Sequence, residues 1–150
     1  MGVDMNLRKR CIILSETNSC RSQIAEAIVN KWAYQHWEAF SAGTQPAASV
    51  HPMALKVLTD IGINHQGEAK PISQFRDQVF ELVIVIKDDP IVICPEWLEF
   101  NKRMHVSFPD PVMVAGTPEE QLKIFRRLRN DIFFKILNLL MDYPQRSVSI

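Results

Sequence analysis

The pattern of apolar and polar positions along the chain predicts strands that alternate with helices. Arg10–Leu14 and Leu82–Ile86 are short, almost wholly apolar runs, as is typical of strands buried on both faces of a parallel sheet. Trp37–Ala42 and Arg103–Val106 are weaker strand candidates. The pattern therefore predicts four strands.

Helical periodicity fills most of the sequence between and after these runs. Apolar residues recur three and four positions apart in Gln23–Tyr34, in His51–Ile61 and from Thr117 to Met141, which indicates amphipathic helices. The last of these opens with Thr-Pro-Glu-Glu, an N-cap followed by a proline and a capping-box glutamate. A shorter helix is predicted over Ile72–Val79, and Gln145–Ile150 is predicted to be a loose tail.

This order of elements predicts an α/β fold, a three-layer α/β/α sandwich around a four-stranded parallel sheet. We find no internal repeat and no interior linker in the 150 residues, so we expect one domain over 1–150 with a core of about 10–141. Ligands of such folds bind outside the carboxyl ends of the strands.

Composition and charge reduce the number of function classes that the protein could belong to. The chain is 47% hydrophobic and 23% charged, which is enough apolar material for a buried core. Its 17 Lys and Arg balance 17 Asp and Glu, so we expect no nucleic-acid partner and no binding to an anionic membrane. The apolar runs are too short to span a bilayer and the N-terminus does not fit a secretory signal, so we expect a cytoplasmic protein. Three cysteines without zinc-like spacing predict neither a disulfide framework nor a metal site.

The loop Ser15–Ser22 is the strongest candidate for chemistry, because it leaves the first predicted strand and enters the first predicted helix. Backbone N–H groups and the helix dipole can converge there on a tetrahedral anion. Arg21 would add a two-donor fork, and Asn18 tolerates the left-handed conformation that such a loop requires. From spacing alone, an ordinary polar turn with a capping serine fits equally well.

Residues beyond this loop decide between the two interpretations. The sequence resembles the low-molecular-weight protein tyrosine phosphatases and the thioredoxin-coupled arsenate reductases that share their fold, and the resemblance covers most of the chain. The segments that carry it are Cys11–Glu26, Ser41–Thr44 and Phe108–Pro111, and those that favour the arsenate reductase branch are Gly116–Glu120 and Phe125–Ile132.

The resemblance implies a complete site. Ser15 stands at the position of the nucleophile, Arg21 would hold the anion, and Asp110 would act as general acid and base. No cofactor is implied; the ligand would be phosphate, arsenate, sulfate or a phosphorylated substrate, the reductant, if any, of the thioredoxin type, and the protein a monomer or weak dimer. The residues expected to bind the oxyanion are Glu16, Thr17, Asn18, Ser19, Cys20, Arg21 and Ser22.

The chain departs from the family pattern at the decisive position, since the family has cysteine where this chain has Ser15. A serine hydroxyl is a weak nucleophile unless an adjacent base activates it. We therefore expect catalysis to be abolished or severely impaired while oxyanion binding survives. The chain is then either a natural pseudophosphatase or the product of an engineered Cys-to-Ser change.

Other departures concern the redox chemistry and the loop. Cys20 and Cys94 match redox positions of the family, but Lys87 stands where arsenate reductases have another cysteine. Thr17 replaces a usual glycine, and Glu16 adds a negative charge that would weaken anion binding unless it points to solvent.

Two other classes of function stay open. The domain could be a non-catalytic binding module for a phosphorylated partner, or a structural or dimerisation domain with a vestigial loop. The histidines offer no strong alternative mechanism: His51 and His65 flank predicted helix ends, where a histidine is more often a cap or a surface residue than a base for Ser15.

Overall fold

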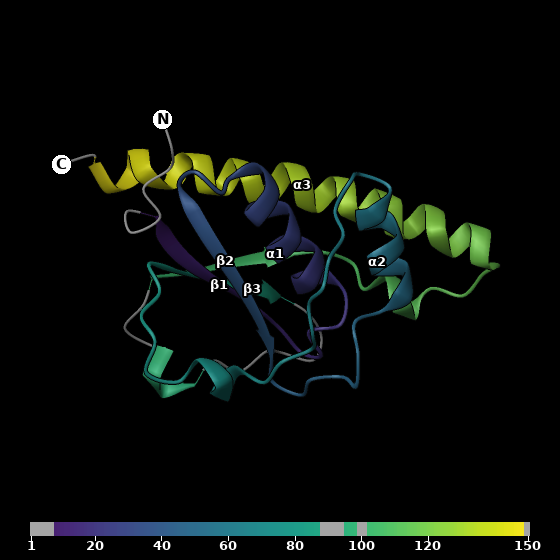
Figure 1. The fold of residues 1–150 in the computed structure, drawn as a ribbon, viewed down its shortest axis with the longest axis horizontal. Coiled ribbons are helices and arrows are strands. Elements are labelled where there is room, and N and C mark those ends of the chain that lie inside the picture. The colour runs from purple at the N-terminus through teal and green to yellow at the C-terminus, as the bar shows by residue number, and fades with distance from the viewer. Residues whose placement is uncertain (1–7, 88–94, 99–101, 149–150) are drawn as a thin grey trace.

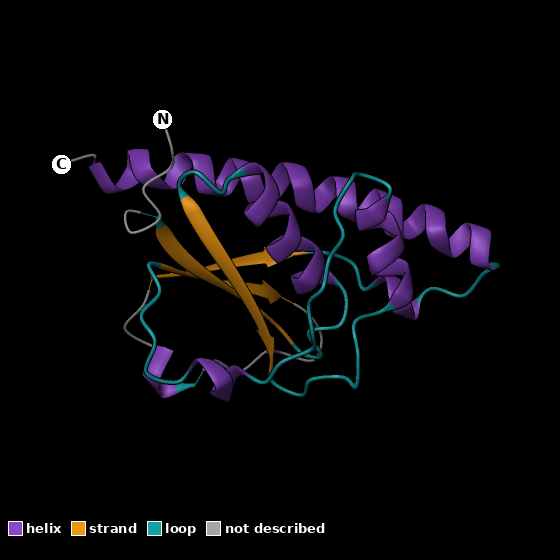
Figure 2. Ribbon diagram, viewed as in Figure 1, coloured by secondary structure: helices purple, strands orange, loops and turns teal. Residues whose placement is uncertain are grey.

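A parallel sheet of four strands forms the centre of the protein, as the sequence predicts (Figures 1 and 2). The computed structural model describes residues 8–87, 95–98 and 102–148. The strands are β1 (Lys9–Ser15), β2 (Trp37–Gly43), β3 (Leu82–Lys87) and β4 (Lys102–Ser107), in the order β2-β1-β3-β4. All neighbours are parallel, so the carboxyl ends of the four strands meet at one edge of the sheet.

Three α-helices pack together and cover one face of the sheet (Figure 1). They are α1 (Arg21–Trp32), α2 (Pro52–Thr59) and α3 (Pro118–Val148). The helix predicted to end at Met141 continues to Val148, so the prediction of a loose tail from Gln145 was wrong for all but the last two residues, which lie outside the described part of the chain.

The opposite face is covered by short 3₁₀ helices, η2 (Ile72–Phe75) and η3 (Glu96–Leu98). The prediction of a helix over Ile72–Val79 was therefore wrong in type and length. Asp77 has a φ of 68°, a left-handed conformation that no right-handed helix can contain. The sheet still lies between two layers, but the second layer is built of single turns and loops.

Alternation along the strands divides the core in two. Cys11 and Ile13 of β1 face the α-helices, whereas Ile12 and Leu14 face the side of η2. Burial on both faces explains why residues 11–14 of β1 and 82–86 of β3 are apolar without interruption. Cys11 is fully buried among apolar neighbours, and this burial strongly raises the pKa of its thiol.

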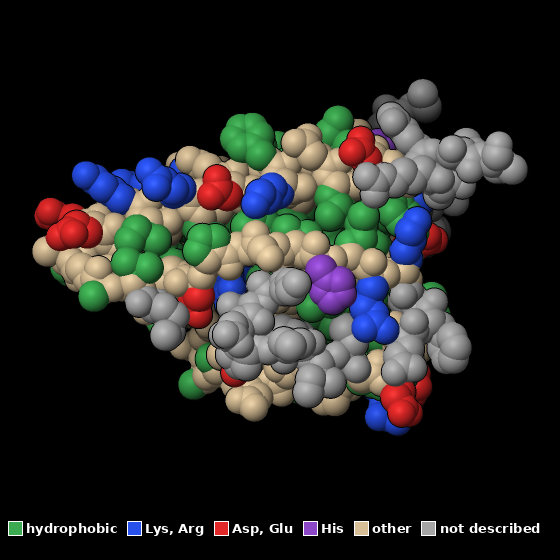
Figure 3. Space-filling view, turned by 180° about the vertical axis from the view of Figure 1, so that it is seen from behind, with side chains coloured by type: hydrophobic (Ala, Val, Ile, Leu, Met, Phe, Trp, Pro, Cys, Tyr) green, Lys and Arg blue, Asp and Glu red, His purple; other side chains and the backbone are tan. Residues whose placement is uncertain are grey.

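Basic and acidic side chains are interspersed on the face that Figure 3 shows, in keeping with their equal numbers in the sequence. Within the described residues, no helix is at once long and apolar enough to cross a membrane.

Candidate oxyanion-binding site

The loop between β1 and α1 is held from outside by its carbonyl groups. The segment that follows β2 donates to four of them: Thr44 N to Ser15 O at 3.2 Å, Gln45 N to Glu16 O at 2.7 Å, Ala47 N to Thr17 O at 2.9 Å, and His51 N to Ser19 O at 2.7 Å. The side-chain amide of Gln23 donates to the fifth, Asn18 O, at 3.1 Å. Every carbonyl from residue 15 to 19 therefore has a partner outside the concave side of the loop.

This arrangement fixes where the N–H groups point. In a trans peptide the N–H of one residue lies opposite the C=O of the residue before it. The amides of residues 16 to 20 thus face away from the groups that hold the carbonyls. The amide of Asn18 shows which side this is, because it donates to Ser15 Oγ at 3.1 Å. The loop thus directs a main-chain donor toward the side chain of Ser15.

Ser15 is the last residue of β1 and is 4% exposed. Its Oγ lies 2.7 Å from Ser22 Oγ, which also accepts a hydrogen bond from Asn18 Nδ2 at 2.8 Å. The backbone N–H of Asn18 therefore donates to the side-chain oxygen of residue 15, and the Ser22 hydroxyl lies where it can also donate to it. Such donors stabilise negative charge on that atom. Among the described residues, no histidine or carboxylate forms a hydrogen bond with Ser15 Oγ.

Arg21 and Asp110 meet beside this loop, although they lie far apart in the sequence. The Arg21 side chain is 7% exposed, and its NH1 donates to Phe108 O at 3.0 Å. Its NH2 lies 3.8 Å from Asp110 Oδ2. Asp110 Oδ1 accepts from Val112 N at 3.1 Å, within the turn that follows β4. The carboxyl ends of β1 and β4 therefore bring a cation and an acid to one site.

A small cavity of about 150 Å³ lies among these groups. Ligand pockets for drug-sized molecules measure roughly 300–1,000 Å³, so this cavity suits a small ion. The residues that line it are Ser15, Thr17, Ser19, Cys20, Arg21, Asp110 and Val112.

Two residues of the loop, Thr17 and Glu16, depart from the family pattern. Thr17 is exposed and its Oγ1 lies 2.9 Å from Ser19 Oγ. Among the described non-glycine residues only Asn18, with a φ of 52°, and Asp77 have positive φ, so Thr17 needs no glycine-like conformation. Glu16 is half-buried and does not line the cavity.

Of the two predicted redox residues, Cys20 and Cys94, the structure describes only Cys20. Cys20 lines the cavity and is 5% exposed, and burial raises the pKa of its thiol to about 12; Arg21 opposes this effect and Asp110 adds to it. The thiol is therefore neutral at physiological pH. Cys94 lies outside the described residues, and Lys87 is the last residue of β3.

The sequence alone assigns no role to two residues that pack against the loop, Gln23 and Gly43. Gln23 is fully buried behind the loop. Gly43 pairs with Ser15 at the end of β2, and a Cβ there would lie 2.7 Å from Glu16 O and 3.0 Å from Asn18 N. Both residues lie in segments that carry the family resemblance, Cys11–Glu26 and Ser41–Thr44, but the resemblance alone gives no physical reason for their presence.

A buried strand thus leads into a loop that carries main-chain donors, and an arginine and an aspartate lie beside that loop. The chain belongs to the low molecular weight phosphotyrosine protein phosphatase family, whose pattern it matches over residues 10–140.

Relatives within this family are arsenate reductases. The chain is 35% identical over 126 residues to an arsenate reductase of Halalkalibacterium halodurans, covering 83% of this chain and 90% of that protein. It is 33% identical over 117 residues to an arsenate reductase of Bacillus subtilis, covering 77% and 83%. These similarities confirm the predicted resemblance to the arsenate reductase branch.

Solved structures agree with the fold. An arsenate reductase in its reduced state superposes with a TM-score of 0.73 at 24% identity, over 90% of this chain and 98% of that one. A low molecular weight phosphotyrosine phosphatase of Vibrio cholerae superposes with a TM-score of 0.73 at 19% identity, over 92% and 98%.

Proposed function

We propose that this protein binds a tetrahedral oxyanion, such as phosphate, arsenate or sulfate, in the loop between β1 and α1 and does not convert it. One observation carries the proposal. The carbonyls of residues 15 to 19 are all held from outside, so the intervening amides face the opposite side. Main-chain amides at a helix N-terminus are a standard anion-binding arrangement. The guanidinium of Arg21 supplies the positive charge beside them.

Ser15 accounts for the absence of turnover. In relatives of this fold with cysteine at this position, a thiolate would attack the central atom of the anion. A serine hydroxyl remains protonated at neutral pH, and Ser15 has hydrogen bonds to Ser22 and Asn18 rather than to a base. The site therefore retains the groups that bind an anion and lacks the one that reacts.

Calorimetric titration of the unmodified protein with phosphate, arsenate and sulfate tests the binding. We expect saturable binding that Arg21→Ala abolishes. Arg126→Ala is the matched control, because Arg126 is an exposed arginine that pairs with Asp60 instead. No heat from any of the three anions would refute the proposal.

The Ser15→Cys variant tests the reason for inactivity. We expect it to hydrolyse an aryl phosphate: the thiolate bonds to phosphorus, the phenolate leaves with a proton from Asp110, and water then cleaves the phosphocysteine. Asp110→Asn should slow this reaction. Failure of the variant to turn over, despite intact anion binding, would show that more than the nucleophile is missing.

The names of the relatives make arsenate the first candidate among the anions. Arsenate reduction by a Ser15→Cys variant would also require a thiol reductant of the thioredoxin type. Comparison of arsenate and phosphate affinities in the titration decides which anion the site prefers.

A further inference from the structure

The loop between β1 and α1, residues 15–22, is called the anion loop below. The carbonyl of Asn18 differs from its neighbours in this loop, because a side chain rather than the backbone donates to it. Gln23 Nε2 lies 3.1 Å from Asn18 O, 2.9 Å from Asn18 Oδ1 and 2.8 Å from Glu68 O. Gln23 lies on α1 and is 0% exposed. The peptide that it holds carries the N–H of Ser19. Gln23 therefore fixes the orientation of the peptide that carries one main-chain donor of the loop.

The same residue supports a strained conformation. Asn18 has a φ of 52°, a left-handed conformation that non-glycine residues rarely adopt and that asparagine tolerates better than most. Its side chain is fixed on both ends: Oδ1 accepts from Gln23 Nε2 and from Lys70 N at 2.9 Å, and Nδ2 donates to Ser22. A conformation of this kind persists only where the surroundings determine it.

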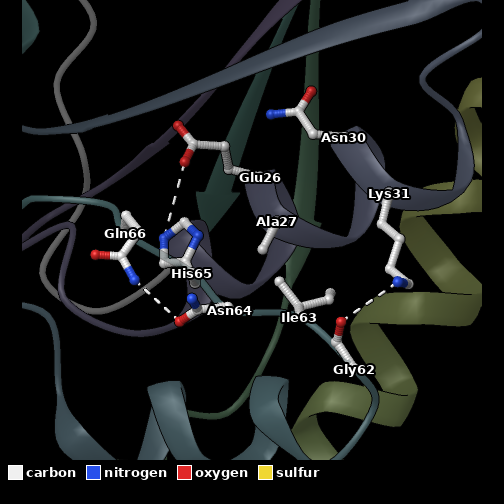
Figure 4. Close-up of a pocket in the computed structure, with 9 residues that line it drawn as sticks. All are labelled: Glu26, Ala27, Asn30, Lys31, Gly62, Ile63, Asn64, His65 and Gln66. Carbon is white, nitrogen blue, oxygen red and sulfur yellow. Dashed lines mark hydrogen bonds and ion pairs between the residues drawn. The ribbon is translucent and has the colours of Figure 1, made fainter.

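His65 orients Gln23 from the other end. His65 Nε2 lies 2.7 Å from Gln23 Oε1. An amide oxygen only accepts, so the proton of this bond is on the imidazole nitrogen. Figure 4 shows His65 beside Glu26 at the wall of a cavity of about 340 Å³. Glu26 Oε2 lies 3.9 Å from the same nitrogen.

The absence of a side chain at residue 67 makes room for this pair. A Cβ on Gly67 would lie 2.5 Å from Gln23 Oε1 and closer still to His65 Nε2. The bond between Gln23 and His65 thus occupies space that any other residue at position 67 would contest.

We propose that Gln23 and His65 are positioning residues of the anion loop, which hold the Asn18 peptide so that the Ser19 amide faces the bound oxyanion. This role rests on the proposed function. It assigns to a buried glutamine and a histidine outside the loop a direct effect on the affinity of the site. Neither residue touches the anion.

The test compares two variants of the same kind. Gln23→Met keeps the size of the side chain and removes its hydrogen bonds, and Gln66→Met makes the same change at an exposed residue that bonds only Asn64 among the described residues. We expect Gln23→Met to weaken phosphate binding about tenfold, as loss of one hydrogen bond to a charged group implies. We expect Gln66→Met to change it less than about twofold.

Two further readouts separate positioning from general stability. The Ser19 amide resonance should shift in Gln23→Met before phosphate is added. In an Asn18→Gly background, where no strain remains to be held, Gln23→Met should have a clearly smaller effect, so that the two changes are not additive. A residue that acts only on stability would lower the free energy of unfolding and leave the Ser19 resonance and the coupling unaffected.

A second variant covers the case in which Gln23→Met does not fold. His65→Leu retains Gln23 and removes its orienting donor, and should weaken phosphate binding about threefold. Unchanged affinity in folded Gln23→Met or, failing that, in His65→Leu would overturn the proposal while Arg21→Ala still abolishes binding. If the unmodified protein binds no phosphate, the proposed function fails first and this role fails with it.

Discussion

Gly43→Ala is the substitution that tests the architecture of the anion loop most sharply. The backbone of Gly43 is not in the left-handed region, so alanine is permitted there and its cost is steric. The new Cβ would lie 2.7 Å from Glu16 O, 3.0 Å from Asn18 N and 3.0 Å from Thr17 C, against 3.4–4 Å for an ordinary contact. All three atoms belong to the backbone, so no side chain can rotate away.

The structure indicates which part must move. Gly43 N donates to Lys70 O at 2.8 Å, and Thr44 N donates to Ser15 O at 3.2 Å. Both bonds hold the end of β2 in place, so the loop has to shift by several tenths of an ångström. Overpacking of this kind costs about 1–3 kcal/mol. We expect urea unfolding to show that loss and calorimetry to show phosphate affinity about tenfold lower, because the displaced amides lose hydrogen bonds to the anion.

Gly62→Ala is the control for stability alone. Gly62 has a φ of +82°, and its nearest neighbour to a new Cβ is Lys31 Nζ at 3.8 Å. Alanine there costs about 1–2 kcal/mol through its backbone conformation and lies outside the anion loop. Phosphate affinity should therefore stay unchanged in this variant. Equal affinities in the Gly43→Ala and Gly62→Ala proteins would refute the reasoning that Gly43 makes room for the loop.

Further predictions concern titration, reactivity and packing. Burial, and then the charge of Lys70, lower the pKa of His65 below its ordinary value of about 6.5. The stability that neutral His65 contributes is thus present above about pH 6.5 and is lost as the pH falls below that value toward the folded pKa. Relative to His65→Gln, the unmodified protein should lose unfolding free energy as the pH falls below about 6.5, and parallel curves would contradict this. A pKa of about 12 leaves Cys20 almost entirely protonated, so mass spectrometry should find its alkylation at pH 8 about a thousandfold slower in the folded than in the urea-unfolded protein, and similar rates would contradict its burial. Ile84→Ala, in the buried strand β3, should lower the free energy of unfolding by about 2–5 kcal/mol with phosphate affinity retained; a loss below about 1 kcal/mol would show that the site collapses around the cavity.

The sequence predicted the strands well because burial on both faces leaves a distinctive pattern. Residues 11–14 of β1 and 82–86 of β3 are uninterrupted apolar runs. The predicted limits differ from the observed ones by one residue at each end of β1 and by one residue at the carboxyl end of β3. The helix predicted over 72–79 shows the limit of periodicity. Ile72 and Phe75 are both buried, but a spacing of three fits one turn of a 3₁₀ helix as well as an α-helix, and the positive φ of Asp77 leaves no sign in the pattern.

The candidate site was predictable where its residues lie together in the sequence or carry the family resemblance. Arg21 and Asp110, 89 positions apart, were paired through the resemblance and approach to 3.8 Å. The sequence allows His51 to be either a helix cap or a surface residue, and the structure shows the cap, since its Nδ1 accepts from Met53 N at 3.1 Å at the start of α2. His65 instead packs against Gln23. Such a contact joins α1 to a distant segment and depends on space at Gly67, so local pattern could not reveal it.

The central claim is that main-chain amides of residues 16 to 20 face a bound tetrahedral anion beside Arg21. Amide resonances of uniformly ¹⁵N-labelled, unmodified protein, followed during titration with phosphate, test it directly. We predict that the amides of Thr17, Ser19 and Cys20 shift saturably with one common dissociation constant and that Arg21→Ala removes these shifts. Phosphate that binds without moving these amides, or that moves them equally in Arg21→Ala, would contradict the account.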